Sequence, residues 1–257
     1  MIYFQRLNMD NSFFIEMSGW KILIDPWLEG TEVDYFEWFN MQWHRTPPLP
    51  YSDIPDFDTV LITQKYPDHF HIKTLKKLAP KHIIGPKSLE NKLKNLFPFS
   101  KIEVLDSKNN TTRINEHKVT FLGTKRKIDP IYDAFILDDG KASVFVSTHG
   151  FYFNNKDLDL LKEASPCHLL ITPFNYYKLP FYLGGLVSPG LSGVKHLCEM
   201  LEPKKVVATH DEDKHAKGIV SKLATIKRPS SPKTLLQHSW LKNRYLDIDH
   251  YNQIKIS

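Results

Sequence analysis

Cysteine is scarce in this chain, which has only Cys167 and Cys198 among its 257 residues. Neither belongs to a Cys-x-x-Cys spacing, and both lie among apolar neighbours, so they predict buried thiols rather than a disulfide framework. The sequence also lacks an apolar run long enough to cross a bilayer, and it lacks a charged and then apolar leader at its start. These absences predict a cytoplasmic protein without a transmembrane segment.

A strong bias toward one charge is missing as well. The 34 Lys and Arg residues and the 29 Asp and Glu residues give a formal net charge of +5. The basic residues are spread along the chain without an arginine-rich run or a basic helix, so we expect no nucleic-acid partner. The densest basic stretches, 73–81 and 125–127, are typical of solvated surfaces.

The composition is sufficient for a large core. Hydrophobic residues make up 41% of the chain and aromatic residues 12%, which is enough to bury a sizeable core at this length. No internal repeat or low-complexity segment divides the sequence. We therefore expect one domain over residues 1–257.

The hydrophobic pattern alternates between strands and helices, which indicates an α/β protein. Three apolar runs at the start predict strands joined by tight turns, and residues 138–140 (Asp-Asp-Gly) are a strong hairpin signal. Strands are predicted at 2–7, 11–17, 20–25, 57–63, 82–85, 101–105, 113–122, 132–137, 143–146, 168–172, 204–209 and 253–256, and helices at 72–79, 88–96, 158–164, 191–201, 214–224 and before 241.

The segment 63–71 joins a predicted buried strand to a predicted helix, and it carries Asp68, His69 and His71. Open α/β sheets place their ligands at such connections, and a carboxylate beside imidazoles can chelate a divalent ion. The alternative is that Asp68 caps the following helix while both histidines are solvated. These residues alone leave both interpretations open.

Residues 63–69 resemble the metal-binding loop of the metallo-β-lactamase fold, which is usually Thr-His-x-His-x-Asp-His. Thr63, Asp68 and His69 match this pattern, whereas Gln64 and Tyr66 replace the two leading histidines. The resemblance is therefore to a degenerate member of that superfamily.

The opening strands resemble the same family, in which a strand ends in Asp-Pro as this chain does at Asp25 and Pro26. The resemblance covers roughly residues 2–222 and implies a four-layer αββα sandwich, most similar to the lactonase and phospholipase-like branch. It places Asp25 behind a ligand histidine, where a carboxylate can orient the imidazole. Without it, Asp25 would be interpreted as the start of a turn.

The family's first metal site lacks its ligands here, since residues 120–127 also contain no histidine. For the second site the resemblance implies four ligands. Asp68 and His69 match the family, His210 follows a strand as the last ligand does, and His149 stands where an aspartate usually bridges the metals. The alternative for His149 is a loop histidine without a role.

Three imidazoles and one carboxylate would suit a single divalent transition metal, namely zinc, with iron or manganese as alternatives. In this scheme His71 could act as an outer ligand or a proton carrier.

Residues 27–51 are unusually aromatic and hold three of the five tryptophans. We expect a short helix near 33–39, followed by a proline-rich arm. The segment could be a lid that presents Trp27 and Trp38 to a hydrophobic substrate, a protein-contact surface that allows a homo-oligomer, or a satellite core.

A second aromatic loop, 173–190, contains Tyr176 and Tyr182 beside two glycines. This composition suits a mobile wall of a substrate pocket. The alternative is an ordinary connection.

Two functions are consistent with these features. The first is hydrolysis of an ester, lactone or phosphodiester bond in a small, hydrophobic molecule by a metal-activated water. In that function Asp68 could act as the base, Tyr66 could donate to a developing oxyanion, and Lys65 or Lys125 could supply positive charge. The second is a non-catalytic scaffold that binds a partner or hydrophobic ligand through residues 27–51.

Overall fold

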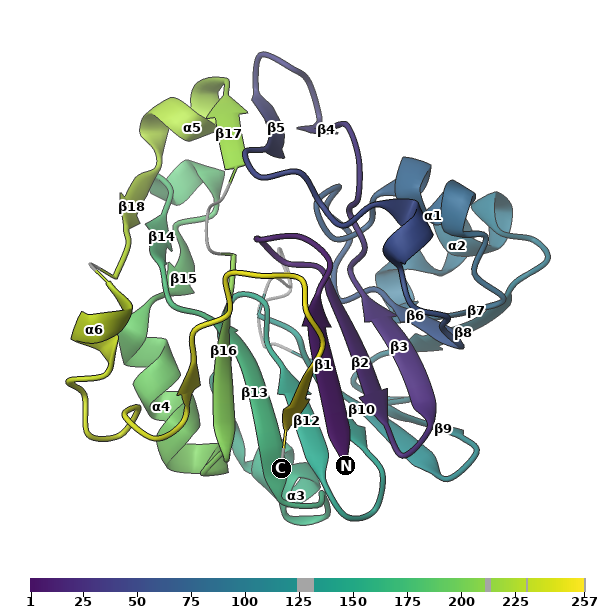
Figure 1. The fold of residues 1–257 in the computed structure, drawn as a ribbon. Helices are drawn as coiled ribbons and strands as arrows, with labels where there is room; N and C mark the ends of the chain where they lie inside the picture. Colours follow the sequence, from purple (N-terminus) through teal and green to yellow (C-terminus); the bar gives the residue numbers. More distant parts are fainter. Residues whose placement is uncertain (124–131, 211–213, 230, 257) are drawn as a thin grey trace.

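The computed structural model describes residues 1–123, 132–210, 214–229 and 231–256. Two seven-stranded sheets pack face to face at its centre, and helices cover their outer faces (Figure 1). This is the four-layer αββα sandwich expected from the sequence, so the predicted fold class is confirmed. No helix in these residues is both long and apolar enough to span a membrane.

The first sheet contains the N-terminal half of the chain and the last strand. Its order is β20 (Ile254–Ile256), β1 (Ile2–Arg6), β2 (Phe13–Met17), β3 (Trp20–Ile24), β6 (Thr59–Leu61), β7 (His82–Pro86) and β8 (Lys101–Leu105). The strands from β3 to β8 run parallel. Helices α1 (Ile72–Leu78) and α2 (Glu90–Leu96) connect them, so their carboxyl ends meet at one edge.

The second sheet likewise has seven strands, some parallel and some antiparallel. Its order is β19 (Tyr245–Leu246), β16 (Lys205–Thr209), β13 (Cys167–Pro173), β12 (Ser143–Val146), β11 (Ala134–Asp138), β10 (His117–Leu122) and β9 (Thr111–Ile114). The strands from β12 to β19 run parallel, and the others are antiparallel. Helices α3 (Asn155–Lys162) and α4 (Leu191–Leu201) lie in the connections that follow β12 and β13.

Three groups of buried side chains hold the layers together. Between the sheets, Phe4 and Phe13 of the first sheet share a cluster with Phe135 of the second. The outer face of the first sheet packs with α1 through residues such as Leu75, and that of the second packs with α4 through residues such as Leu197. Burial on both faces explains the continuous apolar runs of the parallel strands.

The prediction of a short helix near 33–39 is wrong. β4 (Thr31–Asp34) and β5 (Asn40–His44) form an antiparallel hairpin instead. Tyr35 has a left-handed backbone (φ 62°), which ends β4 and starts the turn. The aromatic residues of this segment therefore do not follow one helical face.

The helix predicted at 214–224 is confirmed only at its end, α5 (Ile219–Leu223). Its start is β17 (Lys214–Lys217), which pairs with β5, a strand some 170 residues earlier, so a local pattern could not reveal it. A second small sheet contains β14 (Tyr176–Lys178), β15 (Leu186–Pro189) and β18 (Thr225–Lys227). Figure 1 shows both small sheets at the same end of the sandwich.

Short elements complete the fold. They are the 3₁₀ turns η1 (Tyr51–Asp53), η2 (Lys87–Leu89) and η3 (Phe181–Leu183) and the helix α6 (Pro232–Leu235). The strand predicted at 113–122 is divided into β9 and β10 by a turn at Asn115, whose φ is 53°.

Both cysteines are free and buried, as predicted. Burial raises the pKa of Cys167 to about 12 and that of Cys198 to about 11, so the reactive thiolate is scarce near neutral pH.

We expect an aromatic disulfide reagent at pH 7.5 to modify neither thiol in the native protein and both thiols in denaturant, as measured by absorbance. Rapid modification of the native protein would contradict this burial.

Candidate metal centre

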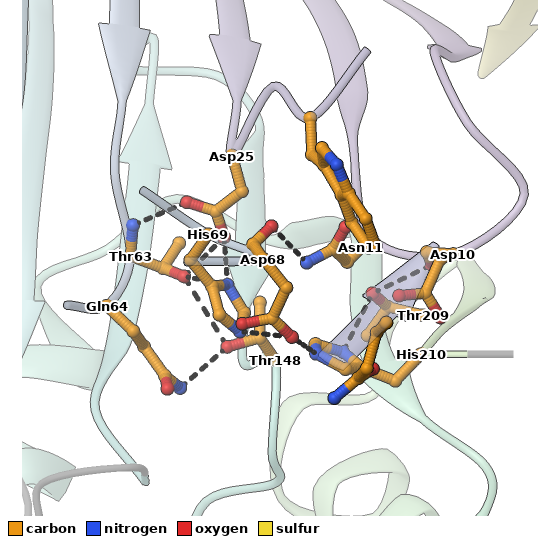
Figure 2. Close-up of polar contacts among 12 residues, drawn as sticks. Asp10, Asn11, Asp25, Thr63, Gln64, Asp68, His69, Thr148, Thr209 and His210 are labelled. Atoms are coloured by element: carbon orange, nitrogen blue, oxygen red, sulfur yellow. Dashed lines mark hydrogen bonds and ion pairs between the residues drawn. The ribbon is translucent and has the colours of Figure 1, made fainter. Parts of the chain in front are cut away.

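The predicted site residues lie at the carboxyl ends of parallel strands from both sheets. Asp25 directly follows β3, the segment with Asp68 and His69 follows β6, His149 follows β12, and His210 follows β16. Because the two sheets face each other, these ends converge at one edge of the sandwich (Figure 2).

The structure brings the four predicted ligands together. Nitrogen atoms of His69, His149 and His210 all lie within 4.8 Å of one another, and all three side chains are buried. The Asp68 Oδ2 atom is 3.9 Å from His69 Nε2 and 3.8 Å from His210 Nε2. Three imidazoles and a carboxylate at such separations can surround one ion, and their role as ligands stays a prediction.

Asp25 fixes the orientation of His69. The His69 Nδ1–H donates to Asp25 Oδ2 at 2.7 Å, and the Thr63 backbone N–H and hydroxyl donate to the same carboxylate at 2.7 and 2.5 Å. Asp25 itself has a left-handed backbone with a φ of 45°, a conformation that aspartate tolerates better than most residues. These bonds direct His69 Nε2 away from Asp25 and toward the other ligands, as Figure 2 shows.

The loop containing Asp10 holds His210. The His210 backbone N–H donates to the Asp10 carbonyl at 2.9 Å, and Asn175 Nδ2 donates to the His210 carbonyl at 2.8 Å. These bonds secure a left-handed backbone at His210, whose φ is 52°. The neighbouring Asn11 Nδ2 donates to the Asp68 carbonyl at 2.8 Å, so one loop positions two of the four predicted ligands.

Two nitrogen atoms of the cluster fit a cation. His69 Nε2 and His210 Nε2 are buried and have no hydrogen-bond partner among the described residues. A buried polar atom without a partner costs about 1–3 kcal/mol, and lone pairs that converge on one point can be satisfied together by a single metal ion. The residues present therefore fit a divalent transition metal.

The charges of the cluster agree with this fit. Burial opposes ionisation of Asp68, but His69, His210 and Lys214 outweigh it and hold the pKa of this carboxyl well below its usual value. Burial and then the neighbouring histidines lower the pKa of His149, which keeps its imidazole neutral. For His69, burial is outweighed by Asp68 and Asp25, which raise its pKa. A bound cation would thus replace a proton on His69.

The positions of the family's first metal site are filled by other contacts. Gln64 Nε2 donates to Thr148 Oγ1 at 2.9 Å, and Tyr66 lines the cavity described below. Neither side chain belongs to the histidine cluster. Lys125 lies outside the described residues.

A cavity of about 400 Å³ opens beside the cluster, and Asp68, His149 and His210 form part of its wall. Its other walls include residues of the two small sheets and of α5, with apolar side chains such as Tyr177 of β14 and Val220 of α5. This volume lies in the range of small-molecule sites.

Of the four predicted substrate contacts, Tyr182 lines the cavity, and its contact with a substrate stays a prediction. Trp27, Trp38 and Tyr176 are not part of the cavity wall. Trp27 is fully buried, with its ring centroid 3.9 Å from that of His44, so it belongs to the core. Trp38 is 62% exposed at the hairpin tip, and Tyr176 is held in strand pairing between β15 and β18.

His71 lies outside both the cluster and the cavity wall. It is the N-cap of α1: its ring nitrogen accepts from the Thr74 backbone N–H at 3.3 Å and contacts the Thr74 hydroxyl at 2.8 Å. Burial lowers the pKa of His71 to about 4. His71 thus caps α1, a task that the sequence had assigned to Asp68 as an alternative, and its role as outer ligand or proton carrier stays a prediction.

A buried ion pair was missed by the sequence analysis. Lys214 Nζ lies 3.0 Å from Asp10 Oδ2 and 3.7 Å from Asp68 Oδ2. Burial opposes the charge of Asp10, but Lys214 and His210 outweigh it and lower the pKa of its carboxyl. No sequence signal identifies the pair, because its members are 204 positions apart and Lys214 lies in a stretch with a helical pattern.

The sandwich, with the predicted ligands at its strand ends, defines a protein of the metallo-β-lactamase fold. A family model described as the beta-lactamase superfamily domain matches residues 8–210, so the chain belongs to that superfamily. No curated protein sequence matches the chain.

Solved structures show the same fold at low sequence identity. An isothiocyanate hydrolase from Delia radicum gut bacteria has a TM-score of 0.71 at 17% identity, with 100% of each chain covered. Igni18, a metallo hydrolase from Ignicoccus hospitalis, has a TM-score of 0.65 at 14% identity, with 99% of this chain and 98% of that one covered. CmlA, a diiron beta-hydroxylase from Streptomyces venezuelae, has a TM-score of 0.60 at 17% identity. The match covers 81% of this chain but only 44% of CmlA, so this chain spans less than half of that protein.

Asp25→Asn should weaken metal binding. The amide keeps the shape of the side chain and tolerates the left-handed backbone, but it no longer provides a charged acceptor for His69. We expect a roughly 10–100-fold loss of zinc affinity, measured by competition with a chromophoric chelator. Asp58→Asn, at an exposed aspartate directly before β6, is the control and should change nothing. Equal affinities for Asp25→Asn and wild type would contradict the orienting role.

His71→Ala should lower stability without affecting the metal. Loss of the cap should reduce the free energy of unfolding by about 1 kcal/mol, measured by urea denaturation in the presence of a chelator. His71→Asn should restore most of this loss, because asparagine is a good cap. A lower metal content in either variant would contradict this expectation and support His71 as an outer ligand of the metal.

Proposed function

We propose that this protein is a metal-dependent hydrolase that uses one divalent transition metal. Asp68, His69, His149 and His210 would hold the ion. The observation that carries this proposal is the pair of buried, unpartnered nitrogen atoms, His69 Nε2 and His210 Nε2, which converge beside the cavity. Membership of the superfamily supports it.

Zinc suits a site of imidazole and carboxylate ligands, and iron or manganese would also be accepted. A bound divalent ion supplies a Lewis acid that polarises a carbonyl or phosphoryl oxygen and lowers the pKa of a water. Similar structures described as a metallo hydrolase and as an isothiocyanate hydrolase make hydrolysis the reaction type to test first.

The side chains near the predicted ligands have defined tasks in this proposal. Asp68 is ionised and faces the cavity, so it can bind the ion or accept a proton from the nucleophile. Tyr66 lines the cavity and can donate a hydrogen bond to a developing oxyanion. Lys214 adds a positive charge 3.7 Å from Asp68, a task that the sequence had assigned to Lys65 or Lys125.

The cavity favours a small molecule with apolar parts. Aromatic and aliphatic side chains such as Phe39, Tyr177, Leu179 and Ile226 contribute to its walls. An ester, a lactone or a phosphodiester would each place a polarisable oxygen beside the predicted ligands while their apolar groups contact these walls.

A second function has its own supporting observation. Tyr35, Phe36 and Trp38 at the tip of the β4–β5 hairpin are exposed, and the rings of Phe36 and Trp38 stack with centroids 5.6 Å apart. Exposed aromatic groups of this kind mark interaction surfaces. A non-catalytic scaffold that binds a partner through this tip is therefore the alternative.

Metal content separates the two functions. Elemental analysis of the purified protein should find about one equivalent of transition metal, and an Asp68→Ala/His210→Ala variant should lose it. His215→Ala, at an exposed histidine on β17, is the control and should retain it. Hydrolysis of p-nitrophenyl butyrate, a homoserine lactone or bis-p-nitrophenyl phosphate should disappear with the metal.

Other outcomes are equally informative. Two equivalents of metal would show that a second site is occupied and would refute the single-ion proposal. No metal after reconstitution with zinc, iron or manganese would refute the hydrolase and leave the scaffold.

A further inference from the structure

The β4–β5 hairpin supplies polar groups to the cavity wall. Glu32 of β4 is directly opposite Gln42 of β5 in the antiparallel register, and both side chains line the cavity. Cross-strand partners in such a pair lie on the same face of the sheet. The two side chains therefore form a single polar patch in a wall that is otherwise rich in apolar groups.

Both side chains present an oxygen atom that lacks a partner. Glu32 is only 2% exposed, and its Oε2 atom has no hydrogen-bond partner among the described residues. The Gln42 Oε1 atom is also buried without a partner there, while Gln42 Nε2 donates to Asn40 Oδ1 at 3.3 Å. These two buried oxygen atoms come from cross-strand partners and have no hydrogen-bond partner among the described residues, so both can accept hydrogen bonds from a ligand.

The charged side chains of the cavity wall also favour a positively charged ligand. Its acidic side chains are Glu32, Asp34 and Asp68, and its basic side chain, apart from the histidines, is Lys214. Lys214 is already engaged by Asp10 at 3.0 Å and lies 3.7 Å from Asp68. The described part of the wall therefore carries more acidic than basic side chains, which disfavours an anionic group of a substrate.

Glu32 shows the electrostatic consequence of this arrangement. Burial, with Asp68 and Asp34 adding to it, raises the pKa of its carboxyl to about 9 even though Lys214 acts in the opposite direction. A positive group placed against Glu32 would reverse this effect and stabilise the carboxylate.

We propose that Glu32 and Gln42 form a subsite for a positively charged N–H donor, a primary or secondary ammonium group, on an otherwise apolar substrate. The ammonium would donate hydrogen bonds to Glu32 Oε2 and Gln42 Oε1 while its apolar body contacts Val220, Ile226 and the neighbouring wall. This inference rests on the proposed function and specifies its substrate class as amine-bearing esters, lactones or related compounds.

The subsite can be tested by ligand binding, without turnover. The probes are n-hexylammonium, 1-hexanol and hexanoate, which share one alkyl chain and differ in the charge of the head group. Affinities are measured by NMR titration at pH 7.5 on the protein as purified and after chelation. The chelated sample removes direct coordination of the amine to a metal.

We expect the wild type to bind n-hexylammonium at least about tenfold more tightly than 1-hexanol, and hexanoate most weakly. Glu32→Gln should reduce the preference for ammonium to within about twofold, because the amide keeps the size of the side chain but cannot become the carboxylate that pairs with the ammonium. Gln42→Leu should lose part of the preference. Glu37→Gln, which removes an exposed carboxylate at the tip of the same hairpin, should retain all of it.

Three results would overturn the subsite. They are equal affinities for the ammonium and the alcohol in the wild type, an unchanged preference in Glu32→Gln, and an equal loss in Glu37→Gln, which would indicate only the general field of the protein. Thermal denaturation verifies that Glu32→Gln is folded, and Glu32→Asp, which retracts the carboxylate, provides a second variant with an intermediate expected loss. Metal content and hydrolysis are measured separately, so failure of the hydrolase and failure of the subsite give different results.

Discussion

The contact between Asp25 and His69 is the interaction on which the candidate metal centre depends. Parallel pairing of β3 with β6 places the end of one strand beside the start of the next loop, so the Asp25 carboxylate receives donors from Thr63 and from His69. The carboxylate is fully buried, and its charge is acceptable only because three donors surround it. The sheet thus determines the direction of an imidazole several residues beyond its last strand.

Charge balance explains why the remaining residues of the centre are arranged as they are. Asp10 and Asp25 are fully buried and Asp68 is partly buried, and Lys214 is a buried cation beside Asp10 and Asp68. Buried charges without partners are strongly destabilising, so further positive charge at the histidines is favourable. Gln64, at a position where the family usually has a histidine ligand, forms a neutral hydrogen bond with Thr148. It therefore adds no charge to the cluster.

Local patterns in the sequence predict most strands, and the family resemblance adds the sandwich and the four candidate ligands. His210 directly follows β16, His149 follows shortly after β12, and Asp68 and His69 lie in the segment after β6. The small sheet of β17, β5 and β4, which contributes to the cavity wall, could not be predicted in this way. β17 pairs with β5 across some 170 residues, and its own residues, Lys-His-Ala-Lys, have no strand pattern. Its position is decided by tertiary pairing, which overrides local propensity.

The errors about single side chains have the same origin. Trp27 is aromatic and lies in an aromatic segment, but its burial against His44 depends on where the hairpin folds back. Lys214 and Asp10 look like surface residues in the sequence, and only the convergence of two distant loops makes them a buried pair. Glu32 likewise gains its buried position from the register of the hairpin. None of these contacts is encoded by residues close to one another in the chain.

In the proposed function, the metal chemistry and the selection of the substrate involve different parts of the fold that are physically connected. The predicted ligands lie on the strand ends of the sandwich, whereas much of the remaining cavity wall comes from the two small sheets and α5. Lys214 connects the two parts. Its backbone pairs with His44 in the small sheet of β17, β5 and β4, and its ammonium lies near Asp10 and Asp68 beside the predicted ligands. A bound molecule that displaced this small sheet would therefore move the Lys214 charge beside Asp68. Because electrostatic interactions are strong in a buried site, a small movement of β17 is sufficient to change the environment of the predicted ligands.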